Sequence, residues 1–118
     1  VSCKLRARAL ETAELYMGKV ALALCPEEPE ATPVLAAKTA DELLDVSGVS
    51  ASFVLCRADD TVYVSARSLG EPNVQVIMET LGGGGHQTVA GGQFPGKTME
   101  EVKTMLQEAI AEHLKEEE

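Results

Sequence analysis

The chain has 118 residues, of which 45% are hydrophobic and 25% charged, and this is the size and composition of one folded domain. Its longest apolar run, residues 20–25, is far shorter than the roughly 20 residues that a membrane-spanning helix needs. Three cysteines without a C-x-x-C pair indicate neither a disulfide framework nor a zinc site, and they fit a reducing compartment. The net charge of -9 argues against tight non-specific binding to a nucleic-acid backbone.

The acidic excess is uneven along the chain. It lies in residues 21–60 and 98–118, whereas residues 61–97 carry balanced charges and hold most of the glycines. A site for a small anion is therefore expected in the central segment.

Two helices flank a buried strand in the first half of the chain. Residues 4–17 are predicted to be helical because apolar side chains recur every three or four positions, and Gly18 would end that helix. The apolar run 20–24 predicts a buried strand. A second helix is expected after a Glu/Pro-rich loop, with either Thr32 or Thr39 as its N-terminal cap.

A hairpin of two strands follows. Residues 52–57 and 61–68 are rich in β-branched and apolar side chains and are joined through an Asp-Asp turn, which predicts antiparallel pairing. Because successive side chains of a strand alternate between its two faces, Ser65 and Arg67 point the same way, opposite to the apolar side chains of their strand.

The second half is predicted to contain a helix opened by Asn73 and ended by Gly82, a short strand over residues 89–94, and a final helix capped by Thr98. The complete order of elements is helix, strand, helix, hairpin, helix, strand, helix. This order predicts an α/β fold in which helices cover a small mixed β-sheet, as a single domain over residues 1–118.

A run of glycines is the first candidate for binding a ligand. Glycine is favoured where the backbone approaches something closely or adopts a positive φ, and successive glycine N–H groups can form an anion-binding concavity. A helical turn near the following histidine would add its positive end. A flexible linker is the competing interpretation, but the serine-rich padding typical of linkers is missing. The candidate residues are Gly82, Gly83, Gly84, Gly85 and His86.

Arg67 is the second candidate, because a planar guanidinium matches the oxygens of a phosphate. The alternative is that Arg67 only forms an ion pair at the end of its strand, with Glu71 or Glu79. Hydroxyl and amide side chains gather close to it in the sequence, which favours a binding role. The candidate residues of this group are Arg67, Ser65, Ser68 and Asn73.

A second glycine motif, GGQFPGKT at Gly91 to Thr98, matches the P-loop pattern G-x-x-x-x-G-K-[ST]. A P-loop site also needs further βα units, and only one helix remains after Thr98. A P-loop nucleotide-binding fragment is therefore the lesser alternative. The sequence offers no H-E-x-x-H and no G-x-S-x-G, so it predicts neither a metal site nor a catalytic residue in this chain.

Residues 63–92, YVSARSLGEPNVQVIMETLGGGGHQTVAGG, resemble the DHH-associated (DHHA) substrate-binding domain of DHH-family phosphoesterases. The order and spacing of SARS, NVQVIME and GGGGH are most similar to the C-terminal domain of membrane-anchored cyclic-di-AMP phosphodiesterases. GGGGH-x-x-x-A marks the wider superfamily, and SARSLG with NVQ narrows it. The AGG at residues 90–92 departs from the related pattern, which often has a second Ala or a polar residue there.

The resemblance implies that this chain is one lobe of a manganese-dependent phosphodiesterase. An upstream DHH catalytic domain, absent from this chain, would bind two manganese ions and activate water, and this lobe would hold the nucleotide without a cofactor of its own. The full-length protein would hydrolyse cyclic di-AMP to linear pApA, and this chain alone would be inactive. By resemblance, the glycine run and His86 contact the nucleotide, Arg67 with Ser65 and Ser68 neutralises another part of it, and Asn73 is a weaker candidate.

The expected partners are a cyclic dinucleotide or short oligonucleotide, the DHH domain of the same parent chain, and a second parent chain in a homodimer. The missing initiator Met favours a domain cut from a longer protein, whose parent would be anchored in a bacterial membrane with this domain in the cytoplasm. The alternative from the wider superfamily is the nucleic-acid-binding lobe of a DHH-family exonuclease or oligoribonuclease.

Overall fold

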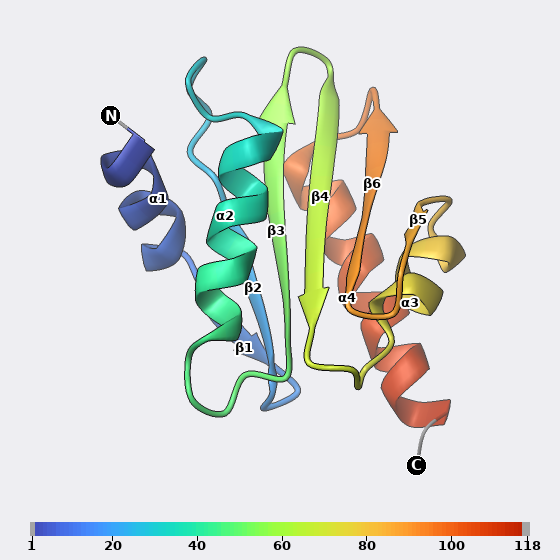
Figure 1. Ribbon diagram of the computed structural model, residues 1–118. Coiled ribbons are helices and arrows are strands. Elements are labelled where there is room, and N and C mark those ends of the chain that lie inside the picture. The colour runs from blue at the N-terminus through green and yellow to red at the C-terminus, as the bar shows by residue number, and fades with distance from the viewer. Residues whose placement is uncertain (1, 117–118) are drawn as a thin grey trace.

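The computed structural model describes residues 2–116 and has three layers, with a six-stranded sheet between two pairs of helices (Figure 1). No helix among the described residues has both the length and the apolar character to cross a membrane. In chain order the elements are α1 (Ser2–Glu11), β1 (Glu14–Tyr16), β2 (Val20–Leu24), α2 (Pro33–Leu44), β3 (Ala51–Ala58), β4 (Thr61–Ser68), α3 (Val74–Thr80), β5 (Gly84–Gly85), β6 (Val89–Pro95) and α4 (Met99–Glu116).

The strands lie in the order β1-β2-β3-β4-β6-β5. Only the β2–β3 pair is parallel, and α2 forms the crossover between these strands, whereas the other four pairs are antiparallel. The sheet is therefore mixed, and the predicted α/β fold is confirmed, including the hairpin β3–β4.

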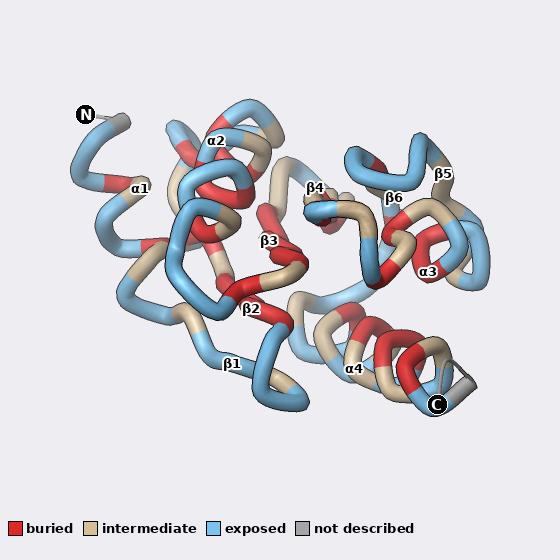
Figure 2. The backbone as a smooth tube through the Cα atoms, turned by 60° about the horizontal axis from the view of Figure 1, so that its bottom comes forward, coloured by how far each residue is buried: buried red, intermediate tan, exposed pale blue. Residues whose placement is uncertain are grey.

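Each face of the sheet has its own hydrophobic core. Helices α1 and α2 pack on one face and helices α3 and α4 on the other. Strand β3 contributes to both cores, because Phe53 and Leu55 point to the α3–α4 side and Val54 and Cys56 to the α1–α2 side. In Figure 2 the buried segments accordingly lie in the middle of the sheet and on the inner sides of α2 and α4.

The helix caps follow the sequence signals. Thr32 caps α2 by accepting the N–H of Leu35, so the helix starts at the earlier of the two predicted positions. At the start of α4, Thr98 and Glu101 each accept the other's backbone N–H, which is the predicted capping box. The hydrogen bond from the Thr98 N–H lowers the pKa of the Glu101 carboxyl.

The helix predicted over residues 4–17 is wrong at its C-terminal end. Helix α1 stops at Glu11, and the next three-residue strand pairs with β2 through a tight turn in which Met17 and Gly18 both have positive φ, 55° and 79°. The Thr12 hydroxyl also bonds the backbone of Leu24 in β2. Gly18 is thus a hairpin residue rather than a helix stop, and the helical spacing of apolar residues continued by coincidence across the boundary.

Candidate functional site

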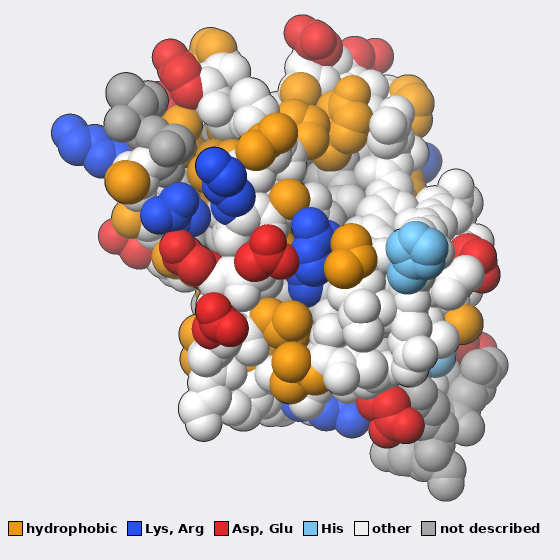
Figure 3. Space-filling view, in the orientation of Figure 1, with side chains coloured by type: hydrophobic (Ala, Val, Ile, Leu, Met, Phe, Trp, Pro, Cys, Tyr) orange, Lys and Arg blue, Asp and Glu red, His pale blue; other side chains and the backbone are white. Residues whose placement is uncertain are grey.

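One half of the sheet has a face that no helix of the described residues covers. Helix α2 lies over β2 and β3 and reaches β4, whereas β6 and β5 are open on that side (Figure 1). In the space-filling view of the same side, hydrophobic side chains gather towards α2, and polar side chains and backbone predominate over β6 and β5 (Figure 3). We call this region of β4, β6 and β5 the open face.

The strand register brings several of the predicted site residues to the open face. Directly opposite residues on neighbouring strands point to the same side of a sheet. Arg67 is opposite Val89, Ser65 is opposite Gly91, and Gly91 is opposite Gly84. The alternation predicted for β4 is confirmed, because its apolar side chains are buried on the other face.

Arg67 is the main source of positive charge at this face. Its Nε–H donates to the Asp41 Oδ1 at 2.8 Å, and its Nη1 donates to the carbonyl of Ala66 at 2.9 Å. The ion-pair partner is therefore a residue of α2, and the alternative pairing with Glu71 or Glu79 is wrong. A guanidinium carries five N–H donors. The remaining three N–H groups of Arg67 bond no other described residue, so they can receive an anion.

Ser68 and Asn73 have partners within the fold. Ser68 is buried on the α3–α4 side of the sheet, where its hydroxyl donates to the Pro72 carbonyl at 2.6 Å and accepts the N–H of Gly70 at 2.9 Å. The Asn73 carbonyl oxygen caps α3 by accepting the N–H groups of Gln75 and Val76. The structure thus separates Ser68 from the Ser65–Arg67 side of the strand, which sequence proximity could not reveal, and gives the Asn73 side-chain oxygen a role as a helix cap.

The cap role of Asn73 gives a stability prediction. Substituting Asn73→Ala leaves the first turn of α3 without its acceptor and should lower the free energy of unfolding by about 1 kcal/mol, whereas Asn73→Asp should restore it. Urea denaturation of the three chains measures the difference. A chain with Asn73→Ala that keeps its stability but loses nucleotide affinity would instead make Asn73 a ligand contact.

The glycine run does not form the predicted concavity of free N–H groups. Gly82, with φ of 91°, and Gly83 donate to the carbonyls of Glu79 and Met78 at 3.1 and 2.8 Å, which completes the C-terminal cap of α3. Gly84 is paired in β5 with the neighbouring strand. The run is therefore a helix cap followed by a strand.

His86 lies at the tight turn between β5 and β6. Its backbone N–H donates to the Val89 carbonyl at 2.6 Å, and its side chain is exposed. The helical turn predicted near His86 is not formed, because the chain reverses here into a hairpin. By continuing the register of this hairpin, His86 stands opposite Val89, which in turn stands opposite Arg67, so that both side chains belong to the open face with β6 between them.

The structure contradicts the P-loop alternative. Most of the motif, from Gly91 to Pro95, is extended in β6 and paired with β4. Lys97 follows a turn at Gly96, and Thr98 is the cap of α4. A strand presents its N–H groups alternately to its two edges, so these residues cannot cradle a phosphate.

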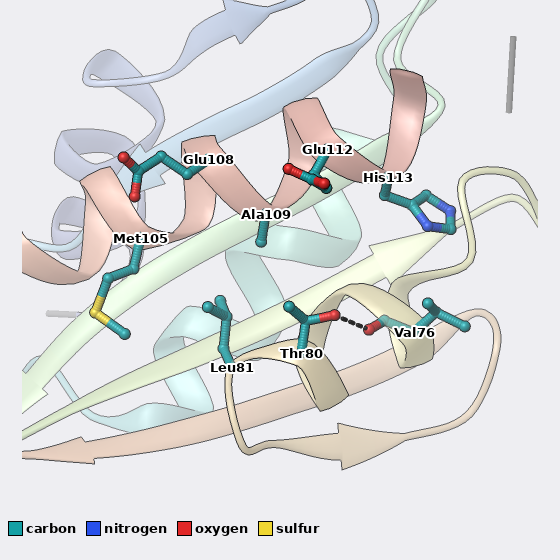
Figure 4. A pocket seen from close by; sticks show the side chains of 8 residues that line it. All are labelled: Val76, Thr80, Leu81, Met105, Glu108, Ala109, Glu112 and His113. Atoms are coloured by element: carbon teal, nitrogen blue, oxygen red, sulfur yellow. Dashed lines mark hydrogen bonds between the residues drawn. The ribbon is translucent and has the colours of Figure 1, made fainter. Parts of the chain in front are cut away.

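A hollow lies on the opposite side of the sheet, between α3 and α4 (Figure 4). None of its lining residues is a predicted site residue, and the Thr80 hydroxyl at its floor donates to the Val76 carbonyl within α3. Among the described residues no group of three or more His, Cys, Asp or Glu side chains is placed to hold a metal ion. The lining residues are Val76, Thr80, Leu81, Met105, Glu108, Ala109, Glu112 and His113.

Comparison with known proteins gives consistent matches. The cyclic-di-AMP phosphodiesterase GdpP of Geobacillus thermodenitrificans is 50% identical over 109 residues, which is 92% of this chain and 17% of that protein. The cyclic-di-AMP phosphodiesterase PdeA of Listeria monocytogenes is 46% identical over 106 residues, 89% of this chain and 16% of that protein. This chain therefore spans only a small part of these relatives.

A solved structure shows the same fold. An exopolyphosphatase-related protein from Bacteroides fragilis superposes with a TM-score of 0.84 at 23% identity, over 95% of this chain and 34% of that chain. The family model described as the DHHA1 domain matches residues 17–115, a range that contains α2 and all strands of the open face. The resemblance inferred from SARS, NVQVIME and GGGGH is confirmed, and the chain belongs to the DHHA1 domain family.

Proposed function

We propose that this chain is the nucleotide-binding lobe of a DHH-family phosphodiesterase, and that the full-length protein hydrolyses cyclic di-AMP to linear pApA. The observation that carries the proposal is the open face, where Arg67 and Ser65 share one side of the sheet with Gly91 of β6 and Gly84 of β5, in a chain 50% identical to a cyclic-di-AMP phosphodiesterase. This chain alone is expected to be inactive, because the proposal assigns the catalytic residues to the DHH domain.

The chemistry of the open face suits a small dianionic nucleotide. Each phosphodiester of a cyclic dinucleotide carries one negative charge, and the free N–H groups of Arg67 can donate to it in charge-assisted hydrogen bonds. Ser65 adds a hydroxyl group and His86 an imidazole ring on the same side. Gly84 has no side chain, and a Cβ there would meet no atom within 4 Å, so the sugar or base can lie against the backbone at this point.

The remaining parts of the site would come from elsewhere in the parent protein. An upstream DHH domain would hold two manganese ions, which supply activated water and stabilise the phosphodiester as it is cleaved. The role of this chain's residues is to bind and orient the nucleotide. The parent would be membrane-anchored with this domain in the cytoplasm, and would assemble as a homodimer. The reading frame upstream of Val1 should accordingly encode an Asp-His-His segment.

Titration of the 118-residue chain with nucleotides tests the proposal. Cyclic di-AMP should bind with weak dependence on salt, because few phosphates are contacted, and a single-stranded RNA oligonucleotide should bind less tightly. A steep salt dependence with preference for RNA would favour the alternative, a nucleic-acid-binding lobe of an exonuclease or oligoribonuclease. Substituting Lys97→Ala should leave the affinity for cyclic di-AMP unchanged. A loss of affinity in this variant would support the P-loop interpretation.

A further inference from the structure

We infer that Asp41, a residue of α2 outside the predicted site, is a positioning residue that holds the Arg67 guanidinium ready for the phosphodiester. The inference rests on the proposed function, because it assigns Arg67 an anionic ligand. It concerns a residue 26 positions away in the sequence, in a helix that carries none of the predicted binding motifs.

The contact between the two side chains is well defined. The Arg67 side chain is only 15% exposed, and the Asp41 side chain is 65% exposed. The Asp41 carboxylate accepts a hydrogen bond from the Nε–H of Arg67, and the Ala66 carbonyl of the same strand accepts one from Nη1. The two bonds fix the plane of the guanidinium from two sides and leave three N–H groups on its outer part.

The sheet also fixes the position of α2 that this contact requires. Ser52 of β3 stands directly opposite Arg67, and its buried hydroxyl donates to the carbonyl of Ala40 at 2.7 Å. Ala40 is the residue before Asp41. The hydrogen bond therefore holds the turn of α2 that carries the carboxylate next to the strand that carries Arg67, so the arginine is ordered by the core rather than by a chance surface contact.

Asp41 has two opposing effects on the binding of an anion, and the larger one decides whether Asp41 strengthens or weakens that binding. The carboxylate offsets part of the positive charge of Arg67, but it is largely solvated, and an exposed ion pair is worth only about 0–1 kcal/mol. A free arginine side chain loses considerable rotamer freedom when it binds. Ordering it beforehand removes this cost, so Asp41 should strengthen binding of the phosphodiester.

The test compares variants that remove the same charge from neighbouring positions of α2. Substituting Asp41→Ala should weaken binding of cyclic di-AMP about 2- to 12-fold. Asp41→Asn keeps an oxygen acceptor for the Nε–H and should recover most of the affinity. Glu42→Ala removes one negative charge from a side chain that pairs with Arg6 instead, and should leave affinity unchanged. Unfolding curves confirm that all variants are folded.

Two further measurements separate this inference from the proposed function. In the absence of nucleotide, the Arg67 Nε–H should exchange with water more slowly in the unmodified chain than with Asp41→Ala, as followed by NMR. On the Arg67→Ala background, Asp41→Ala should have no further effect on affinity. Unchanged or tighter binding with Asp41→Ala, while Arg67→Ala weakens it, overturns only the positioning role. If Arg67→Ala itself leaves binding unchanged, or the unmodified chain binds no cyclic di-AMP, the proposed function fails.

Discussion

Substituting Arg67→Ala is expected to weaken binding of cyclic di-AMP by about 10- to 150-fold, because a charge-assisted hydrogen bond is worth roughly 1.5–3 kcal/mol. The guanidinium is the one positively charged group that the register places on the open face beside Ser65 and Gly91, among the residues that the structure describes. Isothermal titration or a fluorescence competition assay measures the change.

The matched control for this variant is Arg57→Ala. Arg57 lies on the neighbouring strand β3, and its guanidinium is 3.9 Å from the Glu27 carboxylate, at the end of the sheet where β3 turns into β4. The substitution Arg57→Ala therefore removes one positive charge, as Arg67→Ala does, without changing the open face. Affinity should stay within about twofold of the unmodified chain, since a distant exposed charge is screened. Equal losses in the two variants would mean that net charge, rather than the position of Arg67, governs binding.

Arg67→Ala should also cost some stability, because the Arg67 side chain is only 15% exposed and loses its packing and its hydrogen bond to the Ala66 carbonyl. Loss of the ion pair adds little, since the Asp41 carboxylate is 65% exposed and water can take the place of the arginine. Affinity is therefore measured without urea, where the unfolding curve shows the variant to be folded, so that a loss of affinity reports on the ligand contact.

The sequence predicts features that depend on local periodicity. The alternation along β4 identifies the face of Arg67 correctly, because a period of two admits no other arrangement once the apolar side chains are buried. The capping box at Thr98 is equally local and is formed as predicted. In contrast, the apolar spacing before Gly18 suits both a helix and a short strand, and only pairing with β2 decides between them.

The details of the site depend on contacts that are distant in the sequence. Nothing near Arg67 indicates Asp41 as its partner, since their contact requires the β2–α2–β3 crossover to bring α2 across the sheet. Likewise, Ser68 is adjacent to Arg67 in the sequence but points to the other side of the strand. A cluster of polar residues in the sequence therefore indicates where a site is, and the register decides which of them share it.

The glycine run gives the sharpest separation of structural and ligand-binding roles. A Cβ added to Gly83 would lie 2.3 Å from the carbonyl oxygen of Gly91, a backbone atom of the adjacent strand, so the backbone itself would have to shift. A Cβ added to Gly84 would meet no atom within 4 Å, and this residue does not need a positive φ. An added side chain is therefore tolerated at Gly84 but not at the neighbouring Gly83.

Substituting Gly83→Ala should therefore destabilise the chain by about 3 kcal/mol, the upper part of the range for overpacking, with the pairing of β5 to β6 disturbed. Gly84→Ala should leave stability equal or higher by about 0.4–1 kcal/mol, because alanine restricts the unfolded chain more than glycine does. Thermal or urea denaturation measures both. Similar destabilisation by the two substitutions would contradict the close approach at Gly83.

Nucleotide binding should be weakened more by Gly84→Ala than by Gly83→Ala, the reverse of their effects on stability. Gly84 stands opposite Gly91, which stands opposite Ser65, so its added methyl group would project onto the open face. Gly84→Ala should weaken binding of cyclic di-AMP by excluding the nucleotide from the backbone, although the protein is fully folded. Gly83→Ala should mainly reduce the folded fraction, with the affinity per folded molecule less affected. Undiminished binding with Gly84→Ala would mean that the nucleotide does not lie against β5, and that the glycine run is required by packing alone.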